Sequence, residues 1–160
     1  MSAALNRDPS PAAAMVQAET DTCYTMSAVA FRKEMVRGGA FYDLLTRYGQ
    51  ALVGFIMQST ACNAVHSVEQ RLSRWLLMAH DRVGKDEFPL TQEFAAMMLG
   101  TSRPTVTVVA ETLQKAGLIK YHRGRVTVVD RKKLEAGSCE CYGTATDLLK
   151  AVTRSDSRAR

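Results

Sequence analysis

The chain has 160 residues, of which 46% are hydrophobic and 23% are charged. This length suits one ordinary domain or two small ones, and the composition allows a buried core. No apolar run approaches the roughly 20 residues that a membrane-spanning helix needs, and the N-terminus lacks a secretory signal pattern, so we expect a cytoplasmic protein. Twenty-one basic and sixteen acidic side chains give a net charge of +5. That charge permits an anionic partner but does not establish one.

The first residues are expected to carry little regular structure. Met1 to Ala14 are rich in Ala, Ser and Pro and predict a flexible start. Thr20 to Val29 are of types that favour one short strand. Because one strand cannot form a sheet, it either pairs with another segment or is the remnant of a larger domain. Ser27 is expected to cap a short helix that ends at Gly38.

A long amphipathic helix is predicted from Ala40 to about Asn63. Its apolar positions recur at alternating steps of four and three, and they form the seam Phe41, Leu45, Tyr48, Leu52, Phe55 and Ser59. Leu44, Ile56 and Val53 widen this stripe. Such a helix either lies on its own core or pairs with a second copy. Because little else in this chain can cover a seam of about 36 Å, we expect self-association at this helix.

Two helices joined by a tight turn are predicted further along, after a helix that Ser67 begins. Thr91 can cap a helix over about Gln92 to Met98, and Ser102 can cap a second one from Arg103 to Ala116. Gly100 lies between them, where a tight turn needs it. This order is that of a helix-turn-helix unit.

A β-hairpin is predicted directly after these helices. Leu118 to His122 and Arg125 to Val129 are β-rich runs that flank the two-residue turn Arg123-Gly124. A hairpin in this place makes a wing. Residues 117–136 hold six basic and two acidic side chains, a net charge of +4, so the basic excess lies beside the second helix.

The cysteines and histidines predict no catalytic or metal site. Four cysteines are too few for a disulfide scaffold. Cys23 and Cys62 lie in apolar stretches and are expected to be small buried hydrophobes. Cys139 and Cys141 form a C-x-C pair, which is not the usual zinc spacing, and the three histidines are scattered. We therefore expect no metal, no cofactor and no enzyme activity.

The helix-turn-helix and wing resemble a known family. The stretch TSRPTVTVVAETLQKAGLIKYHRGRVTVVD, preceded by LTQEFAAMMLG, is similar to the winged-helix DNA-binding domain of Crp/Fnr-type bacterial transcription regulators. The resemblance runs from about Val65 to Leu134. The long helix before it fits the dimerisation helix of that family.

This resemblance implies a mainly α fold with a small β wing. Residues 1–39 would be a flexible start and the end of an effector domain, 40–64 the dimerisation helix, 65–136 the winged helix-turn-helix domain, and 137–160 a C-terminal helix and basic tail. The family's β-roll effector domain normally precedes the long helix, and only about forty residues do so here. The chain thus resembles a regulator truncated at its N-terminus, and no effector ligand or iron–sulfur cluster is implied.

The recognition helix would carry the residues that read DNA sequence. Arg103 either pairs with guanine O6 and N7 or is an ordinary solvated side chain, and the motif favours the base contact. Pro104 and Val108 stand where many family members have Glu and a second Arg, so only apolar contacts, such as with a thymine methyl, are expected of them. Thr105 and Thr107 either touch phosphate or a methyl group or are plain surface residues.

Phosphate contacts are expected around this helix. Ser102 and Thr91 are N-caps, to which the resemblance adds contacts with phosphate. Arg123 and Arg125 of the wing either contact phosphate or make the hairpin soluble.

The expected function is that of a sequence-specific regulator that binds double-stranded DNA as a homodimer. Two recognition helices would enter major grooves about 34–36 Å apart on a palindromic operator. The resemblance adds RNA polymerase as a further partner, and no membrane partner is expected. An alternative is a truncated dimerisation module that modulates full-length relatives by forming heterodimers. An enzyme that uses Cys or His is a third class, and no motif supports it.

Overall fold

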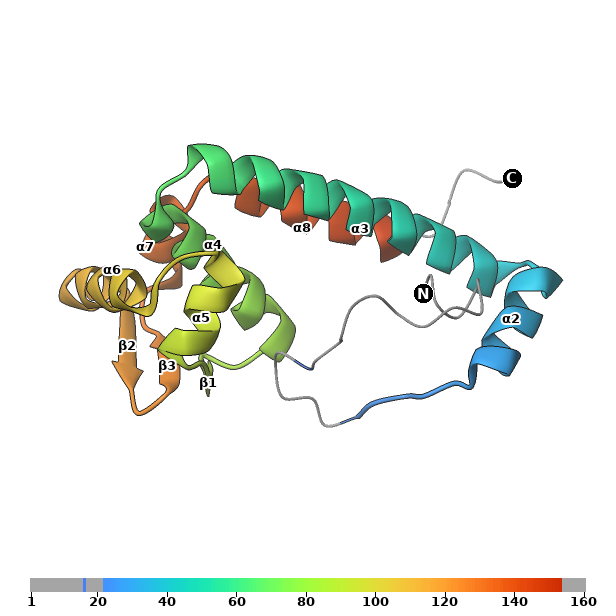
Figure 1. Ribbon diagram of the computed structural model, residues 1–160, viewed down its shortest axis with the longest axis horizontal. Helices are drawn as coiled ribbons and strands as arrows, with labels where there is room; N and C mark the ends of the chain where they lie inside the picture. The colour runs from blue at the N-terminus through green and yellow to red at the C-terminus, as the bar shows by residue number, and fades with distance from the viewer. Residues whose placement is uncertain (1–15, 17–21, 154–160) are drawn as a thin grey trace.

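The computed structural model describes residue 16 and residues 22–153, and the expected flexible start and basic tail lie largely outside these ranges. The elements are α2 (Ala28–Arg37), α3 (Ala40–Val65), α4 (Val68–Val83), β1 (Glu87–Pro89), α5 (Gln92–Leu99), α6 (Arg103–Lys115), β2 (Ile119–His122), β3 (Arg125–Val128), α7 (Arg131–Ala136) and α8 (Cys141–Thr153). Helices α4 to α7 and the sheet gather at one end of α3, while α2 lies at its other end (Figure 1). The mainly helical fold with a small sheet confirms the predicted fold class.

Among the described residues, no helix is both long and apolar enough to cross a membrane.

The predicted strand near the N-terminus is wrong over the part that the structure describes. Residues 22–27 form no regular element, and α2 begins at Ala28. The Ser27 side chain accepts a hydrogen bond from the Ala30 backbone N–H, so a helix starts inside the predicted strand. The cap and the end of this helix at Gly38 are as predicted. Cys23 is exposed, contrary to the expectation that it is buried.

The long helix α3 is confirmed, but α8 covers one of its flanks (Figure 1). The side chain of Leu148 lies against Gly54, at 3.2 Å from where a Cβ would stand, and the Arg47 Nε donates to the Val152 carbonyl at 3.4 Å. The expectation that little else in the chain can cover this helix is therefore wrong. The reason is that the chain returns after α7 and runs α8 along α3.

Part of the predicted seam of α3 packs against other elements of the same chain. Phe41 packs edge-to-face on Phe31 of α2, with ring centroids 5.8 Å apart, and Phe55 packs on the core of the winged domain. Beside that seam, Val53 (57%), Ile56 (56%) and Met57 (68%) are more exposed than Tyr48 (43%) and Leu52 (40%) within it. The free apolar side of α3 thus includes Val53 and Ile56, which widen the predicted stripe, while Phe41 and Phe55 of the seam pack inside the chain.

The winged domain has one core between α4, α5, α6, α7 and the sheet. The Ser67 side chain accepts from the Gln70 backbone N–H, and the Gln70 side chain accepts from the Ser67 N–H, so a capping box begins α4. The largest fully buried apolar side chains of the domain are Leu76, Leu77, Leu99, Leu113, Ile119, Leu134, Val106 and Val126.

The wing is part of a three-stranded antiparallel sheet in the order β1-β3-β2. Val126 at the centre of β3 pairs with Phe88 on one side and Tyr121 on the other. Arg123 (φ 46°) and Gly124 (φ 76°) both have positive φ, as the predicted two-residue hairpin turn requires. Pro89 lies in the edge strand β1, where a proline is tolerated.

A glycine fixes the turn between α5 and α6, and its replacement should destabilise the fold. Gly100 has a φ of +60° and nothing within 4 Å of an added Cβ, so the cost of a side chain there is purely conformational. We expect Gly100→Ala to lower the free energy of unfolding by about 1–2 kcal/mol, measured by chemical denaturation. Gly143→Ala, also in open space but inside α8, is the control and should not destabilise. Equal effects of the two substitutions would contradict this account.

Candidate nucleic-acid interface

The N-terminus of α6 is organised by its cap. Ser102 has extended backbone angles, and its Oγ accepts from the Thr105 N–H at 3.3 Å and lies 2.8 Å from Thr105 Oγ1. Pro104 follows in the first turn, where a missing N–H costs nothing. This geometry presents the exposed Arg103 as the first residue of the helix.

Arg103 is free to reach a partner. Its side chain makes no hydrogen bond or ion pair within residues 22–153. It lines a shallow hollow with Thr91, Gln92 and Gly124. Burial raises the pKa of the neighbouring Tyr121, and the charge of Arg103 partly offsets this rise in pKa. The arginine thus lies between the start of α5, the start of α6 and the wing.

The faces of α6 are divided between the core and the surface. Val106 is 1% exposed, and Ala110 and Leu113 are buried beside it. Pro104 and Val108 lie on the outer face, and Val108 is 63% exposed. A valine this exposed on a well-packed helix is available for an apolar contact.

Thr107 is engaged within the protein. Its single hydroxyl hydrogen has two acceptors, Gln92 Oε1 at 2.8 Å and the Arg103 carbonyl at 3.1 Å. Thr107 therefore ties α6 to the first residue of α5. Sequence analysis missed Gln92, because its partner lies 15 residues away and no local pattern marks the pair.

The start of α5 lies close to the wing. Thr91 caps α5 by accepting from the Phe94 N–H at 3.1 Å, and its methyl group lies 3.7 Å from where a Cβ of Gly124 would stand. Arg123 occupies the exposed tip of the hairpin. Arg125 pairs instead with Glu87 of β1 at 2.5 Å, so its charge is not as free as the sequence indicated.

Fewer basic side chains near the wing lack an acidic partner than the charge count of the sequence predicts. Three of the six bases in residues 117–136 pair with acids: Arg125 with Glu87, Arg131 with Asp81, and Lys133 with Asp130. Arg131 also donates to the Tyr142 hydroxyl at 2.7 Å, so it joins α7 to α4 and α8.

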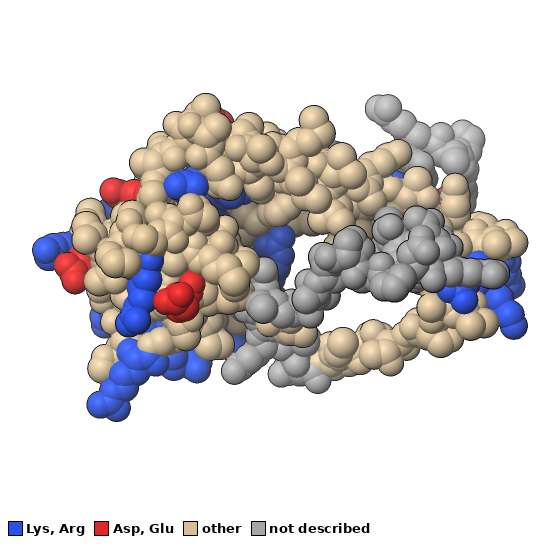
Figure 2. All heavy atoms as spheres, in the orientation of Figure 1, with Lys and Arg blue, Asp and Glu red and all other residues tan. Residues whose placement is uncertain are grey.

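The other bases remain on the surface. Lys120, Arg123 and Lys132 form no ion pair with another residue of the described part of the chain. Figure 2 shows basic side chains gathered over the end of the molecule that carries α6 and the wing, with some acidic ones among them.

Three of the cysteines lie together, away from this surface. Cys62, Cys139 and Cys141 are buried as one cluster beside His66. Sequence analysis missed the group because Cys62 and Cys139 are 77 residues apart. Burial raises the pKa of the Cys62 thiol to about 12, and a hydrogen bond with Cys139 adds to the rise in pKa.

Comparison with known protein families identifies the class of this domain. Residues 70–136 match the family model of the Crp-like helix-turn-helix domain. No curated protein matches the chain by sequence. The part of the chain that carries the cap, α6 and the wing is therefore a Crp-like helix-turn-helix domain.

Solved structures agree with this assignment. A protein from Eubacterium rectale described as a Crp/Fnr-family transcriptional regulator is 25% identical, with a TM-score of 0.54 over 68% of this chain and 50% of its own. A CooA variant from Carboxydothermus hydrogenoformans is 22% identical, with a TM-score of 0.59 over 68% and 53%. A CRP-family transcriptional regulator from Thermus thermophilus is 22% identical, with a TM-score of 0.52 over 71% and 55%. This chain spans about half the length of these structures.

Proposed function

We propose that this protein is a sequence-specific DNA-binding transcription regulator. The observation that carries the proposal is the free, exposed Arg103 at the N-terminus of α6, beside the wing tip, within a Crp-like helix-turn-helix domain. In helix-turn-helix proteins the N-terminal residues of the second helix contact base edges in the major groove. Arg103 is thus the candidate for a bidentate contact with guanine.

The surrounding residues divide into reading and positioning roles. Pro104 and Val108, exposed on the same helix, would make apolar contacts with bases. Ser102 and Thr91 cap the two helices, whose N-terminal N–H groups favour phosphate. Arg123 would contact phosphate from the wing.

The remaining candidates have support roles. Thr105 and Thr107 are already hydrogen-bonded within the protein and would hold the reading helix in place. Arg125 has Glu87 as a competing partner, so its contact with phosphate would be the weaker of the two wing contacts.

We propose that α3 pairs with the same helix of a second copy. The helix has 26 residues, about 39 Å. On the side of α3 away from α8, residues spaced at alternating steps of four and three form a stripe, of which only Gly49 is half-buried and the rest are exposed. We call it the α3 stripe, and it consists of Tyr42, Thr46, Gly49, Val53, Ile56 and Thr60. Such spacing is that of a helix pair, and a small residue at its middle lets two backbones approach.

A dimer of this kind fixes the geometry of the DNA site. Two copies of α6 related by a two-fold axis would enter grooves about one helical turn apart, so the operator would be palindromic. Hydroxyl-radical footprinting on a bound fragment should show two protected regions related by two-fold symmetry. A single undivided region would contradict the dimeric arrangement.

Binding to DNA itself is tested by its dependence on salt. Contacts to phosphate release counterions, so the logarithm of the affinity for a fluorescent mixed-sequence duplex should fall linearly with the logarithm of the salt concentration. Fluorescence anisotropy at several salt concentrations measures this slope. No binding even at low salt would overturn the proposed function.

The phosphate contact proposed for the wing tip can be tested by its own share of this salt dependence. Arg123→Asn is expected to reduce the slope by about one phosphate contact and to weaken binding to all sequences alike. The fold should tolerate the change, because Asn adopts the positive φ of this position more readily than Arg. The control is Lys33→Asn, which removes one exposed charge from α2 at the far end of α3. An equal slope change for both variants would show that the wing makes no specific contact.

A second candidate function rests on the α3 stripe alone. A chain that pairs through α3 and binds DNA weakly would modulate full-length relatives by forming heterodimers. Co-expression of tagged copies of this chain and an intact relative tests it. Absence of a mixed dimer under conditions where each forms its own homodimer would exclude this function.

A further inference from the structure

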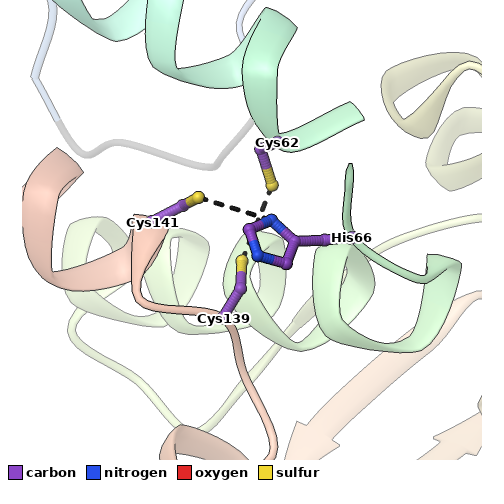
Figure 3. A group of neighbouring side chains, drawn as sticks. All are labelled: Cys62, His66, Cys139 and Cys141. Carbon is purple, nitrogen blue, oxygen red and sulfur yellow. Dashed lines mark hydrogen bonds between the residues drawn. The ribbon is translucent and has the colours of Figure 1, made fainter. Parts of the chain in front are cut away.

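Four side chains from two distant segments converge beside the end of α3. Cys62 and His66 come from the C-terminal end of that helix, and Cys139 and Cys141 from the start of α8 and the residues before it (Figure 3). Each offers one potential ligand atom, and these atoms all lie within 4.8 Å of one another. The three cysteines are at most 3% exposed, and the His66 side chain is 13% exposed.

We propose that these four residues bind one Zn²⁺ ion in a tetrahedral Cys₃His site. Zinc–sulfur bonds of about 2.3 Å in a tetrahedron set neighbouring sulfurs about 3.8 Å apart. The Sγ atoms of Cys62 and Cys139 are 3.6 Å apart, and Cys141 Sγ lies 3.6 Å from His66 Nδ1. The spacing suits a single ion, because a polynuclear iron–sulfur cluster divides its protein ligands between two or more irons and so holds some of them farther apart than the 4.8 Å limit seen here. Soft thiolates in a tetrahedral arrangement select zinc among the common divalent ions.

Residues next to the four proposed ligands are placed to form hydrogen bonds with them, as the residues around a bound metal ion do. His66 Nδ1 faces the sulfurs, while its Nε2 lies 3.2 Å from Glu140 Oε1. A metal-bound histidine typically donates its other N–H to a carboxylate, which fixes the ring and its tautomer. The Gln58 amide also donates to Cys141 Sγ at 3.0 Å, and a thiolate accepts such a bond better than a thiol does.

The site also accounts for a buried charge. On binding, three S–H groups release their protons to solvent as three Zn–S bonds and one Zn–N bond form, which leaves a centre of net charge −1. Arg74 is 6% exposed, and its Nε and Nη1 have no hydrogen-bond partner. Arg74 lines a hollow with Ser59 and Asn63, which lie three residues before and one residue after Cys62 in α3. A buried guanidinium is costly unless a negative charge balances it, and a bound zinc site supplies one.

A zinc ion here would fasten the last turn of α3 to the first turn of α8. This junction is where the winged domain meets the long helix, so the ion would hold α8 along α3 (Figure 1). The inference depends only on the cluster and its neighbours. It stands whether or not the chain binds DNA.

Metal titration of the full chain tests the proposal. The protein is stripped with a chelator under reducing conditions and titrated with Co²⁺ alone, then with Zn²⁺. We expect one Co²⁺ per chain with the visible absorption of a tetrahedral, thiolate-bound ion, and its displacement by one Zn²⁺. Cys139→Ser and His66→Ala should each weaken binding on the order of 100-fold or more. Cys23→Ser, which removes the exposed cysteine, is the control and should bind like the unmodified chain.

A variant that keeps all four proposed ligands is also needed, because loss of a ligand could prevent folding. Glu140→Gln removes no ligand, and we expect it to weaken Zn²⁺ binding about 10-fold or more, whereas Glu135→Gln should have no effect. Three results would overturn the proposal: failure to bind Co²⁺ or Zn²⁺, an octahedral Co²⁺ spectrum, or affinities unchanged in Cys139→Ser and His66→Ala. A Cys62–Cys139 disulfide that persists in protein purified and kept in the presence of a reductant, detected by mass spectrometry, would also overturn it.

Discussion

Replacing Arg103 by Gln is expected to weaken binding to a specific operator by about 5- to 150-fold, equivalent to about 1–3 kcal/mol. The reason is that the Arg103 side chain makes no hydrogen bond within residues 22–153 and is presented by the cap at Ser102, so its guanidinium is available for guanine. Sequence selectivity should relax at the base pair that it contacts, while affinity for random DNA changes little. Competition binding with single-base operator variants measures both effects.

The matched control for this variant is Lys115→Gln. Lys115 is an exposed base in the last turn of the same helix, so the substitution removes the same charge without touching the reading end. Its effect on operator selectivity should be small. If Arg103→Gln instead weakened binding to every sequence equally, the arginine would contact phosphate and the proposed readout would be wrong.

Placing a charge on the α3 stripe is expected to separate the proposed dimer. Val53→Glu would put a carboxylate at the centre of the paired helices, where it has no partner. Because a monomer engages only one half-site, affinity for a two-half-site operator should fall by about 100-fold or more. Sedimentation velocity measures the assembly, and operator titration measures the affinity.

A second apolar-to-Glu change on the same helix controls for general effects of charge. Ala61→Glu lies on an exposed part of α3 outside the stripe and should leave the dimer intact. A dimer that persists in Val53→Glu would contradict pairing through this stripe. Dissociation by both variants alike would show that the stripe has no special role.

The winged domain was predictable because its signals are local. Three helices begin at a cap whose side-chain oxygen accepts a hydrogen bond from the backbone N–H three residues later; the caps are Ser67, Thr91 and Ser102. The alternation of buried and exposed residues in β2 and β3 and the turn at Gly124 fix the hairpin in the same way. Helix bounds therefore agree with the structure within one or two residues here.

The features that sequence analysis missed all depend on distant pairs. Arg125 meets Glu87 only because β1 joins the sheet, and this edge strand is three residues long. The covering of α3 by α8 brings Gly54 to Leu148, and no short-range pattern encodes that contact.

The cysteine cluster was missed for the same reason. The C-x-C spacing of Cys139 and Cys141 argued against zinc, but the other two ligands come from α3. Helical spacing puts Cys62 and His66, four residues apart, on the same side of that helix. This pairing was a usable signal, and only the fold shows what it faces.

Selection from a randomised duplex pool at two salt concentrations tests most directly the proposal that this chain reads DNA sequence as a two-fold dimer. Sequencing the retained DNA should give a palindromic motif whose half-sites are about one helical turn apart, with retention that falls steeply as salt rises. Salt-sensitive retention with no enriched motif would contradict the claim that Arg103 and its helix read bases. No retention at low salt would contradict DNA binding altogether.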